Sequence, residues 1–244
     1  AAIKEIAKRS GPETGSLPRL GIIYTIGPYL LPDLVRQAIE QVPQMPLLLQ
    51  ENFTARLLEM LRTGELDCAI LAEPFPDTGL AVAPLYDEPF MAALPAGHRL
   101  AQGDAVSSAQ LRGEHMLLLG TGHCFRDHVL QVCPEFAGFA SSGEGIRKSF
   151  EGSSLETIKH MVAAGMGVTL VPRLAVPAEA LAAQACETAA PGVVRYLPVR
   201  DGAAAPPTRR VVLAWRRSFT RYEAIAALRN AIYACALPGV TRLS

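Results

Sequence analysis

Residues 19–42 read RLGIIYTIGPYLLPDLVRQAIEQV, and this stretch predicts the fold. Its first six residues are the apolar run of a buried strand. Residues 27–42 carry apolar side chains at helical spacing, with Pro28 tolerated near the start. A second strand is expected at 46–51, a second helix at 54–64 and a third strand at 66–73. This β-α-β-α-β succession is typical of a parallel sheet with right-handed crossovers, in an α/β fold.

The second half of the chain predicts another lobe. Residues 79–95 (GLAVAPLYDEPFMAALP) contain two strand-like runs with no helix between them, and we expect the chain to cross there. Further strands are predicted at 115–120, 167–172, 193–199 and 209–217, and helices at 122–133, 153–165 and 219–237. The last helix should pack back on the first lobe. The predicted division is a linker over 1–16, one subdomain from 17–87 and 216–244, and a second from 88–215.

Composition limits the possible functions. The chain has 23 basic and 23 acidic residues, whereas a surface that binds nucleic acid usually carries a basic excess, so we expect no DNA binding by this chain alone. No apolar run approaches the roughly 18–20 residues of a membrane span. Residues 1–16 read as the end of a helix and a linker, as expected after removal of a preceding module. Five cysteines without a secretory signal predict a reducing cytoplasm.

Two cysteines stand at the ends of one predicted helix, in residues 122–133 (GHCFRDHVLQVC). Phe125, Val129 and Val132 form its apolar face. In a continuous helix, Cys124 and Cys133 would lie about 13.5 Å apart along the axis. A disulfide needs Cα atoms about 4.4–6.8 Å apart. The two thiols are therefore either unrelated, or part of a segment that rearranges.

Cys124 stands at the helix start, with His123 before it and Arg126 and Asp127 after it. A helix N-terminus and nearby cations favour the thiolate, which is the nucleophilic form of cysteine. The second thiol precedes a proline, which ends the helix there. The alternative is a pair of ordinary structural cysteines, as we expect for Cys68, Cys186 and Cys235.

Three other kinds of site are less well supported. A metal site would use His123, Cys124, His128 and Cys133, but zinc sites favour paired ligands and adjacent residues rarely reach one ion. A cysteine hydrolase built on Cys124 and Asp127 would need a base and an oxyanion hole, and no hydrolase signature surrounds them. In GTGHCF, a phenylalanine occupies the position of the third glycine of a dinucleotide fingerprint. No metal and no cofactor is therefore expected.

Polar residues at strand ends indicate a binding cleft. Thr25 follows the first predicted strand, Thr54 the second, and Cys124 the strand at 115–120. Ligands of open α/β sheets bind beyond the carboxyl ends of the strands, so we expect these three residues to face one cleft. Thr25 and Thr54 could also be a turn residue and a helix N-cap. Residues 209 and 210 could be an arginine pair on an edge strand, facing solvent.

Several stretches together resemble the effector-binding half of LysR-type transcriptional regulators. These are YTIGPYLLPDLV, RTGELDCAILAEPF, LYDEP, GHCFRD with a cysteine nine residues beyond the first, SLETIKHMVAAGMGVTLVP and RRVVLAWRR. TIGPYLLP and the cysteine pair are typical of the peroxide-sensing members, and the resemblance covers roughly residues 17–237. It implies two Rossmann-like α/β subdomains with a cleft between them, as in type II periplasmic binding proteins. It also implies assembly into homodimers or homotetramers.

The resemblance also implies residue roles. Cys124 matches the cysteine that reacts with hydrogen peroxide, and Cys133 matches the cysteine that resolves it into a disulfide. The surroundings of the reactive thiol match His123, Arg126 and Asp127. The polar residues that hold peroxide and water match Thr25 and Thr54. The basic residue that favours the thiolate matches Arg210.

The expected function is therefore the regulatory domain of a bacterial, cytoplasmic transcription regulator that senses hydrogen peroxide and is not an enzyme. Formation of the Cys124–Cys133 disulfide would change the oligomer, and a cellular thiol reductant would reset it. DNA and RNA polymerase would be partners of the full-length protein only. The alternative is a related domain that binds a small organic ligand in the cleft, with incidental cysteines.

Overall fold

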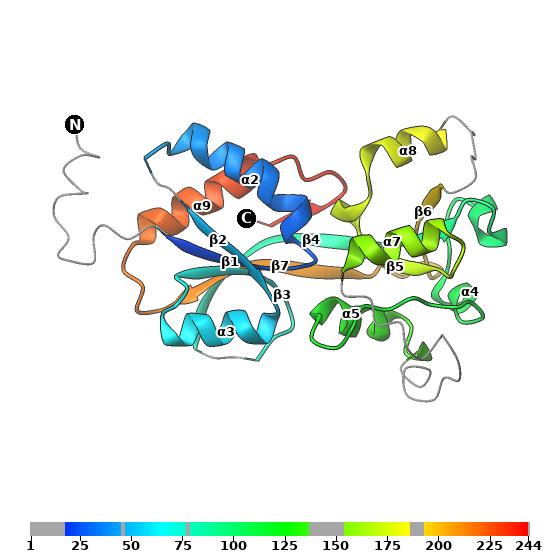
Figure 1. The fold of residues 1–244 in the computed structure, drawn as a ribbon, viewed down its shortest axis with the longest axis horizontal. Coiled ribbons are helices and arrows are strands. Elements are labelled where there is room, and N and C mark those ends of the chain that lie inside the picture. The colour runs from blue at the N-terminus through cyan, green and yellow to red at the C-terminus, as the bar shows by residue number, and fades with distance from the viewer. Residues whose placement is uncertain (1–17, 45–46, 77–78, 137–153, 186–192, 244) are drawn as a thin grey trace.

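The first lobe is built on three parallel strands. The computed structural model describes residues 18–44, 47–76, 79–136, 154–185 and 193–243. Strand β1 pairs in parallel with β2 on one side and with β3 on the other. Helices α2 and α3 connect them and lie on opposite faces of the sheet (Figure 1). The bounds are β1 Arg19–Ile23, α2 Gly27–Gln41, β2 Leu48–Asn52, α3 Thr54–Thr63 and β3 Cys68–Ala72. The predicted succession and its parallel pairing are confirmed.

Two glycines explain how α3 fits against this sheet. A Cβ atom on Gly21 in β1 would lie 2.5 Å from Leu66 Cδ1 and 2.6 Å from Leu57 Cδ2, so a larger residue would force these two side chains to shift. Gly64 ends the helix in the left-handed conformation, with a φ of 81°. The stop predicted at Gly64 is therefore confirmed.

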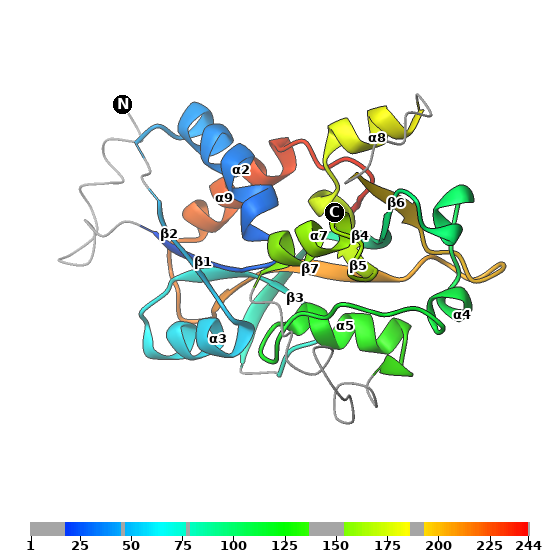
Figure 2. The same ribbon diagram turned by 45° about the vertical axis from the view of Figure 1, so that its right-hand side comes forward.

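Two long antiparallel strands join the lobes (Figure 2). Residues 80–95, predicted as two runs, form the single strand β4 (Leu80–Pro95). Its pairing with β7 (Thr208–Arg216) changes register between Pro84 and Tyr86, and this irregularity divides the apolar pattern that looked like two strands. β7 lies between β3 and β4, so it is an interior strand and the edge position considered for residues 209 and 210 is wrong.

The far half of β4 carries the second lobe. This half pairs antiparallel with β5 (Thr169–Pro172) and β6 (Val194–Pro198). The short β8 (Thr241–Arg242) pairs with Tyr86 and Asp87, earlier in β4. The predicted strand at 115–120 is not a continuous strand, because only isolated bridges form there, at Met116, which pairs with Val168, and at Leu119. The remaining helices are α4 Ser108–Leu111, α5 Cys124–Val132, α7 Leu155–Ala163, α8 Ala178–Ala185 and α9 Tyr222–Ala234, with 3₁₀ turns η1 Arg99–Gln102 and η3 Arg173–Ala175.

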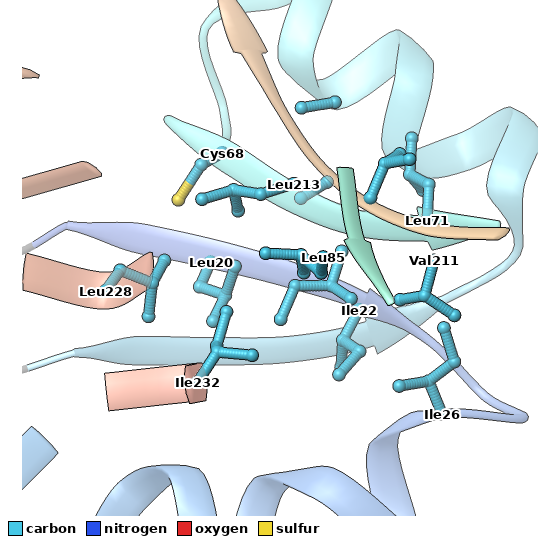
Figure 3. Close-up of a cluster of buried hydrophobic side chains, with 14 of the residues drawn as sticks. Leu20, Ile22, Ile26, Cys68, Leu71, Leu85, Val211, Leu213, Leu228 and Ile232 are labelled. Carbon is cyan, nitrogen blue, oxygen red and sulfur yellow. The ribbon is translucent and has the colours of Figure 1, made fainter. Parts of the chain in front are cut away.

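Each lobe has its own apolar core. The first lies between the sheet and its helices and includes Leu20, Ile22, Leu213 and Ile232 (Figure 3). Helix α9 contributes to it and packs beside α2, as predicted. The second core includes residues 90–94 of β4 and continues to Val199. Residues 211–214 pack in the first core, so we place the return to the first lobe between residues 199 and 211, earlier than the predicted 216.

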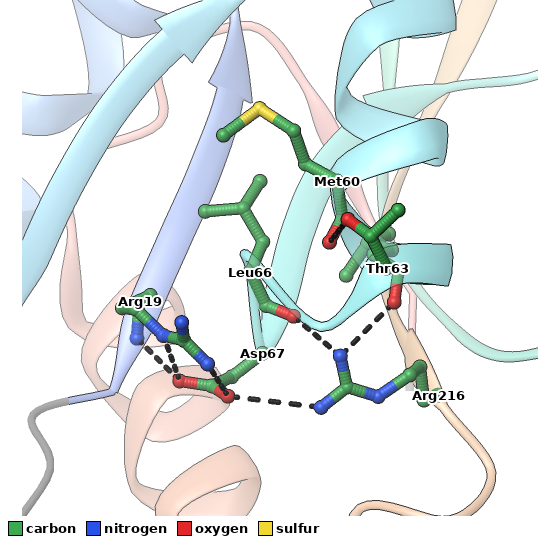
Figure 4. Close-up of polar contacts among 7 residues, drawn as sticks. Arg19, Met60, Thr63, Leu66, Asp67 and Arg216 are labelled. Atoms are coloured by element: carbon green, nitrogen blue, oxygen red, sulfur yellow. Dashed lines mark hydrogen bonds and ion pairs between the residues drawn. The ribbon is translucent and has the colours of Figure 1, made fainter.

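An acidic side chain fastens the ends of three strands. Asp67 accepts a hydrogen bond from the backbone N–H of Arg19 at 2.8 Å (Figure 4). It also forms an ion pair with the Arg19 guanidinium, with Nη2 3.1 Å from Oδ1. Arg216, at the end of β7, lies 3.8 Å from the same carboxylate and donates to the carbonyl oxygens of Leu61 and Leu66 at 3.0 and 2.9 Å. The network satisfies carbonyl groups where α3 turns into β3.

A polar cluster joins the lobes through α2 and α7. The Tyr29 hydroxyl donates to Glu156 Oε1 at 2.5 Å, and Lys159 donates to the same oxygen at 2.9 Å. Lys159, itself buried, also donates to the Ala175 carbonyl oxygen at 2.9 Å and lies 5.6 Å from the centre of the Tyr29 ring. These contacts hold the start of α2 against the second lobe.

A histidine fastens α5 to the first lobe. His128 is buried, and its Nε2 lies 2.9 Å from the carbonyl oxygen of Glu73, just beyond β3. Its ring lies beside those of Phe125 and Phe90. Burial, reinforced by the positive charge of Arg209, lowers the pKa of His128 below its ordinary value of 6.5. The folded chain therefore favours the neutral imidazole.

The lowered pKa predicts acid sensitivity. Unfolded chains bind this proton more readily than the folded chain, so the free energy of unfolding should fall as the pH drops below about 6.5. His128→Gln keeps a donor for the Glu73 carbonyl and removes the titration, and its melting temperature should fall less between about pH 7.5 and pH 5.5. His160→Gln, an exposed change in α7, is the control. Equal losses in wild type and His128→Gln would contradict this role of His128.

Candidate functional site

The reactive position is the first turn of α5. Cys124 is the first residue of this helix, with His123 as the extended N-cap residue. The helix runs to Val132 and Cys133 is its C-cap, so the predicted helix and its end before Pro134 are confirmed. Cys124 is partly exposed and packs against the first core, whereas Phe125 and Val129 are buried in the second core. The helix therefore lies across the junction of the two lobes.

A small pocket opens at this thiol. Residues 23–25 and 52–54 line it from the first lobe, and Gly122, His123 and Cys124 line it from the second. Its cavity volume is about 10 Å³, which is the scale of a single water molecule. The structure thus brings Thr25, Thr54 and Cys124 to one cleft between the lobes, as predicted from their places at strand ends.

The two threonines are held differently. Thr25 is buried, and its Oγ1 accepts a hydrogen bond from Arg209 at 2.7 Å. Thr54 is the first residue of α3 and Phe53 is the N-cap, so the capping role considered for Thr54 is wrong. Its Oγ1 is buried and has no hydrogen-bond partner within the described part of the chain. A buried hydroxyl without a partner lowers the free energy of unfolding by about 1–3 kcal/mol. The pocket therefore contains a hydroxyl that no described residue bonds.

The arginine that contacts a pocket residue is Arg209, through Thr25, and not Arg210. Arg210 is exposed and forms an ion pair with Asp87, with Nε 2.9 Å from Oδ1. Arg209 is 1% exposed and points to the opposite face of β7. Successive side chains of a strand alternate between its two faces, so a prediction that is off by one residue selects a side chain on the opposite face. The structure therefore does not place Arg210 at the pocket, and its effect on the thiolate stays a prediction.

Arg209 connects four parts of the structure. Its Nη1 and Nη2 donate to Oγ1 and the carbonyl oxygen of Thr25 at 2.7 and 3.0 Å. Its Nε donates to Glu88 in β4 at 2.9 Å, and Glu88 also accepts from the backbone N–H of Leu174 at 2.8 Å. The guanidinium carbon lies 5.2 Å from the centre of the Phe125 ring, which is cation–π distance.

The three residues around Cys124 have different surroundings. His123 is buried in the pocket wall. Arg126 does not line the pocket, and its Nη1 donates to the Leu119 carbonyl oxygen at 2.7 Å. Asp127 is exposed, in the first turn of α5, where a carboxylate stabilises a helix N-terminus. The structure therefore places only His123 of the three beside Cys124 in the pocket.

The second thiol lies in a different environment. Cys133 is fully buried in the second core, and burial raises the pKa of its thiol to about 11. Cys124 and Cys133 are both free. Cys68 and Cys235 are also free and buried, and burial raises the pKa of each to about 12. Cys186 lies outside the described residues. Among those residues, no group of three or more His, Cys, Asp or Glu could hold a metal ion, and no helix is long and apolar enough to span a membrane.

Two residues next to the site are not among the predicted site residues. The sequence suggests a solvent-facing charge at Arg209, whereas residues 208–211 of β7 alternate between exposed and buried, with Arg209 buried. The sequence suggests only a metal ligand at His128. It stands one helical turn beyond Cys124, and its position beside Phe125 and Val129 on the apolar side of α5 was the available signal.

Comparison with known proteins identifies the family. The LysR substrate binding domain matches residues 11–234. The hydrogen peroxide-inducible genes activator of Dickeya chrysanthemi is 35% identical over 227 residues, which are 92% of this chain and 68% of that protein. The DNA-binding transcriptional dual regulator OxyR of Escherichia coli K12 is 39% identical over 177 residues, 72% of this chain. The chain spans only 56% of that protein's length.

Solved structures agree with these matches. A reduced form of OxyR from Neisseria meningitidis has a TM-score of 0.82 at 39% identity, covering 93% of this chain and 99% of that one. The reduced OxyR regulatory domain of Pseudomonas aeruginosa has a TM-score of 0.74 at 44% identity, covering 89% and 97%. The chain therefore belongs to the LysR substrate-binding domain family, with the two-lobed, type II periplasmic-binding-protein-like fold of OxyR regulatory domains.

Proposed function

We propose that this chain is the peroxide-sensing part of a bacterial, cytoplasmic transcription regulator and is not an enzyme. The observation that carries the proposal is the pocket at Cys124, which is the scale of a water molecule and contains the unpartnered hydroxyl of Thr54. A small hydrogen-bonding oxidant suits such a pocket. An organic effector would need a cavity of about 300 Å³ or more, so the pocket disfavours the alternative function.

The proposed chemistry has two steps. The Cys124 thiolate attacks one oxygen of hydrogen peroxide, the O–O bond breaks, and the departing hydroxide takes up a proton and leaves as water. The product at Cys124 is a sulfenic acid. The Cys133 thiol, as thiolate, then attacks the Cys124 sulfur, a disulfide forms, and the sulfenic oxygen leaves as a second water. A cellular dithiol returns both residues to thiols by disulfide exchange.

The surrounding residues support the first step by position. Thr25, held by Arg209, and the free hydroxyl of Thr54 can bond the peroxide oxygens, while the α5 N-terminus favours an anionic sulfur. The second step requires α5 to unwind, since Cys133 is buried at the other end of a nine-residue helix. We infer that this rearrangement alters a homodimer or homotetramer, and through it the contacts of the full-length protein with DNA and RNA polymerase.

Thr54→Val should slow oxidation of Cys124 by hydrogen peroxide by about 5–150-fold, the effect of losing one hydrogen bond worth about 1–3 kcal/mol. The same change should leave the melting temperature unchanged or higher, because it removes a buried hydroxyl that has no partner. Stopped-flow rates and thermal unfolding measure the two effects. Thr63→Val, at the other end of α3, is the control. An unchanged rate in Thr54→Val would remove its hydroxyl from the mechanism.

Variants of Arg209 and Arg210 should react with peroxide at different rates. Arg209→Met is combined with Glu88→Gln, because breaking one side of a buried ion pair costs about 3–5 kcal/mol. The double variant loses the bonds that hold Thr25 and should react with peroxide about 10–100-fold more slowly, as expected for charge-assisted hydrogen bonds. Arg210→Met, which changes an exposed pair, should keep the wild-type rate. Slowing by Arg210→Met alone would restore the original assignment.

The disulfide should be accompanied by loss of α5. Closing a helical rise of about 13.5 Å to a Cα separation of about 6 Å breaks its backbone hydrogen bonds. Amide exchange over residues 124–133 should therefore be faster after peroxide treatment than before. Cys133→Ser should stop at a sulfenic acid, detected by its mass after dimedone trapping, and should keep slow exchange. Equal exchange in reduced and disulfide-bonded protein would exclude the rearrangement.

A further inference from the structure

Three aromatic rings stand together in the wall of the pocket. Tyr24 follows β1, Phe53 follows β2, and His123 precedes α5, and all three line the pocket. The ring centres of Tyr24 and Phe53 are 5.1 Å apart, those of Phe53 and His123 are 4.9 Å apart, and those of Tyr24 and His123 are 5.9 Å apart. We call these three residues the aromatic triangle. Two of its rings belong to the first lobe and one to the second.

The triangle borders both the pocket and the solvent. All three of its residues line the pocket, and Tyr24 and Phe53 are each 37% exposed, while His123 is 7% exposed. The edge-to-face angle of 75° between Tyr24 and Phe53 is a favoured aromatic geometry, and 74° between Phe53 and His123 is similar. The exposure of these large rings is therefore not a sign of loose packing.

The Phe53 ring lies beside the backbone of Gly122. A Cβ atom on Gly122 would lie 3.4 Å from Cδ1 and 3.5 Å from Cε1 of this ring. Gly122 has a φ of 99°, which favours glycine. The ring thus packs on the backbone two residues before Cys124, across the junction of the lobes. Thr54, with its unpartnered hydroxyl, is the next residue after Phe53.

We infer that the aromatic triangle is a size filter that selects hydrogen peroxide over bulky organic hydroperoxides at Cys124. This inference rests on the proposed peroxide chemistry. A peroxide with a carbon substituent must place that substituent where the rings stand, because a cavity of about 10 Å³ has no room for it. Hydrogen peroxide has no substituent, so the rings do not oppose it.

The test compares two oxidants on the same thiol. The probes are hydrogen peroxide and cumene hydroperoxide, and the readout is the ratio of their second-order rate constants for Cys124 oxidation. Phe53→Ala should raise the cumene-to-hydrogen-peroxide ratio by about tenfold or more, which is the usual effect of changing the fit of an apolar pocket. Tyr24→Ala should raise it as well. Tyr222→Ala, an exposed tyrosine at the start of α9, is the control and should keep the wild-type ratio.

The outcomes separate the two hypotheses. If wild-type Cys124 reacts with hydrogen peroxide no faster than a free thiol, the proposed function fails. If it reacts fast but Phe53→Ala and Tyr24→Ala keep the wild-type ratio, the filter fails and the proposed function stands. Phe53→Leu keeps an apolar side chain without a ring and should also raise the ratio. It replaces Phe53→Ala if that variant has a lower melting temperature than the other proteins.

Discussion

A guanidinium with almost no exposed surface stands where the two lobes meet. Arg209 forms an ion pair with Glu88 and donates hydrogen bonds to Thr25. The Phe125 ring lies at cation–π distance from the guanidinium. A buried charge is stable only when its partners are all in place, and removing one partner of a buried pair costs about 3–5 kcal/mol. The loop after β1, strand β4 and helix α5 are therefore held in one relative arrangement by one residue of β7.

This arrangement is compatible with the proposed unwinding of α5. The bonds of Arg209 to Glu88 and Thr25 involve the first lobe and the long strands, whereas α5 offers the Phe125 ring and the neighbouring His128 imidazole. If α5 unwinds as proposed, Arg209 loses an aromatic neighbour and keeps its carboxylate. Thr25 would then stay in place, because its contacts with Arg209 do not involve the helix.

The sequence pattern predicted the helices and strands that depend on the spacing of nearby apolar residues and on nearby turn residues. The succession from β1 to β3, the helix between the two cysteines and the stop at Gly64 all follow from apolar spacing and turn residues, and the structure has them. The site followed in part, because strand ends of a parallel sheet must face one edge, and Thr25, Thr54 and Cys124 do line one pocket.

The errors have non-local causes. Residues 211–214 of β7 are buried on both faces, so their pattern does not reveal which of two adjacent arginines points inward. That choice is made by Glu88, which is 121 positions away in the chain. The strand predicted at 115–120 forms isolated bridges and no continuous pairing with a strand of the described chain, which no local pattern reports. Thr54 failed as an N-cap because Phe53 takes that position, and its hydroxyl is left inside the pocket.

Two unpartnered polar atoms mark the site as less than optimally stable. Within the described chain, Thr54 Oγ1 and His128 Nδ1 are both buried without a hydrogen-bond partner, and each such atom costs about 1–3 kcal/mol. Under the proposed mechanism, a hydrogen-bonding oxidant in the pocket would lower the first cost, and unwinding of α5 would lower the second by exposing the His128 ring to water. Apolar burial of Phe125 and Val129, worth about 1.5–3 kcal/mol each, opposes these costs and stabilises the folded helix, so unwinding would have to be driven by formation of the proposed disulfide.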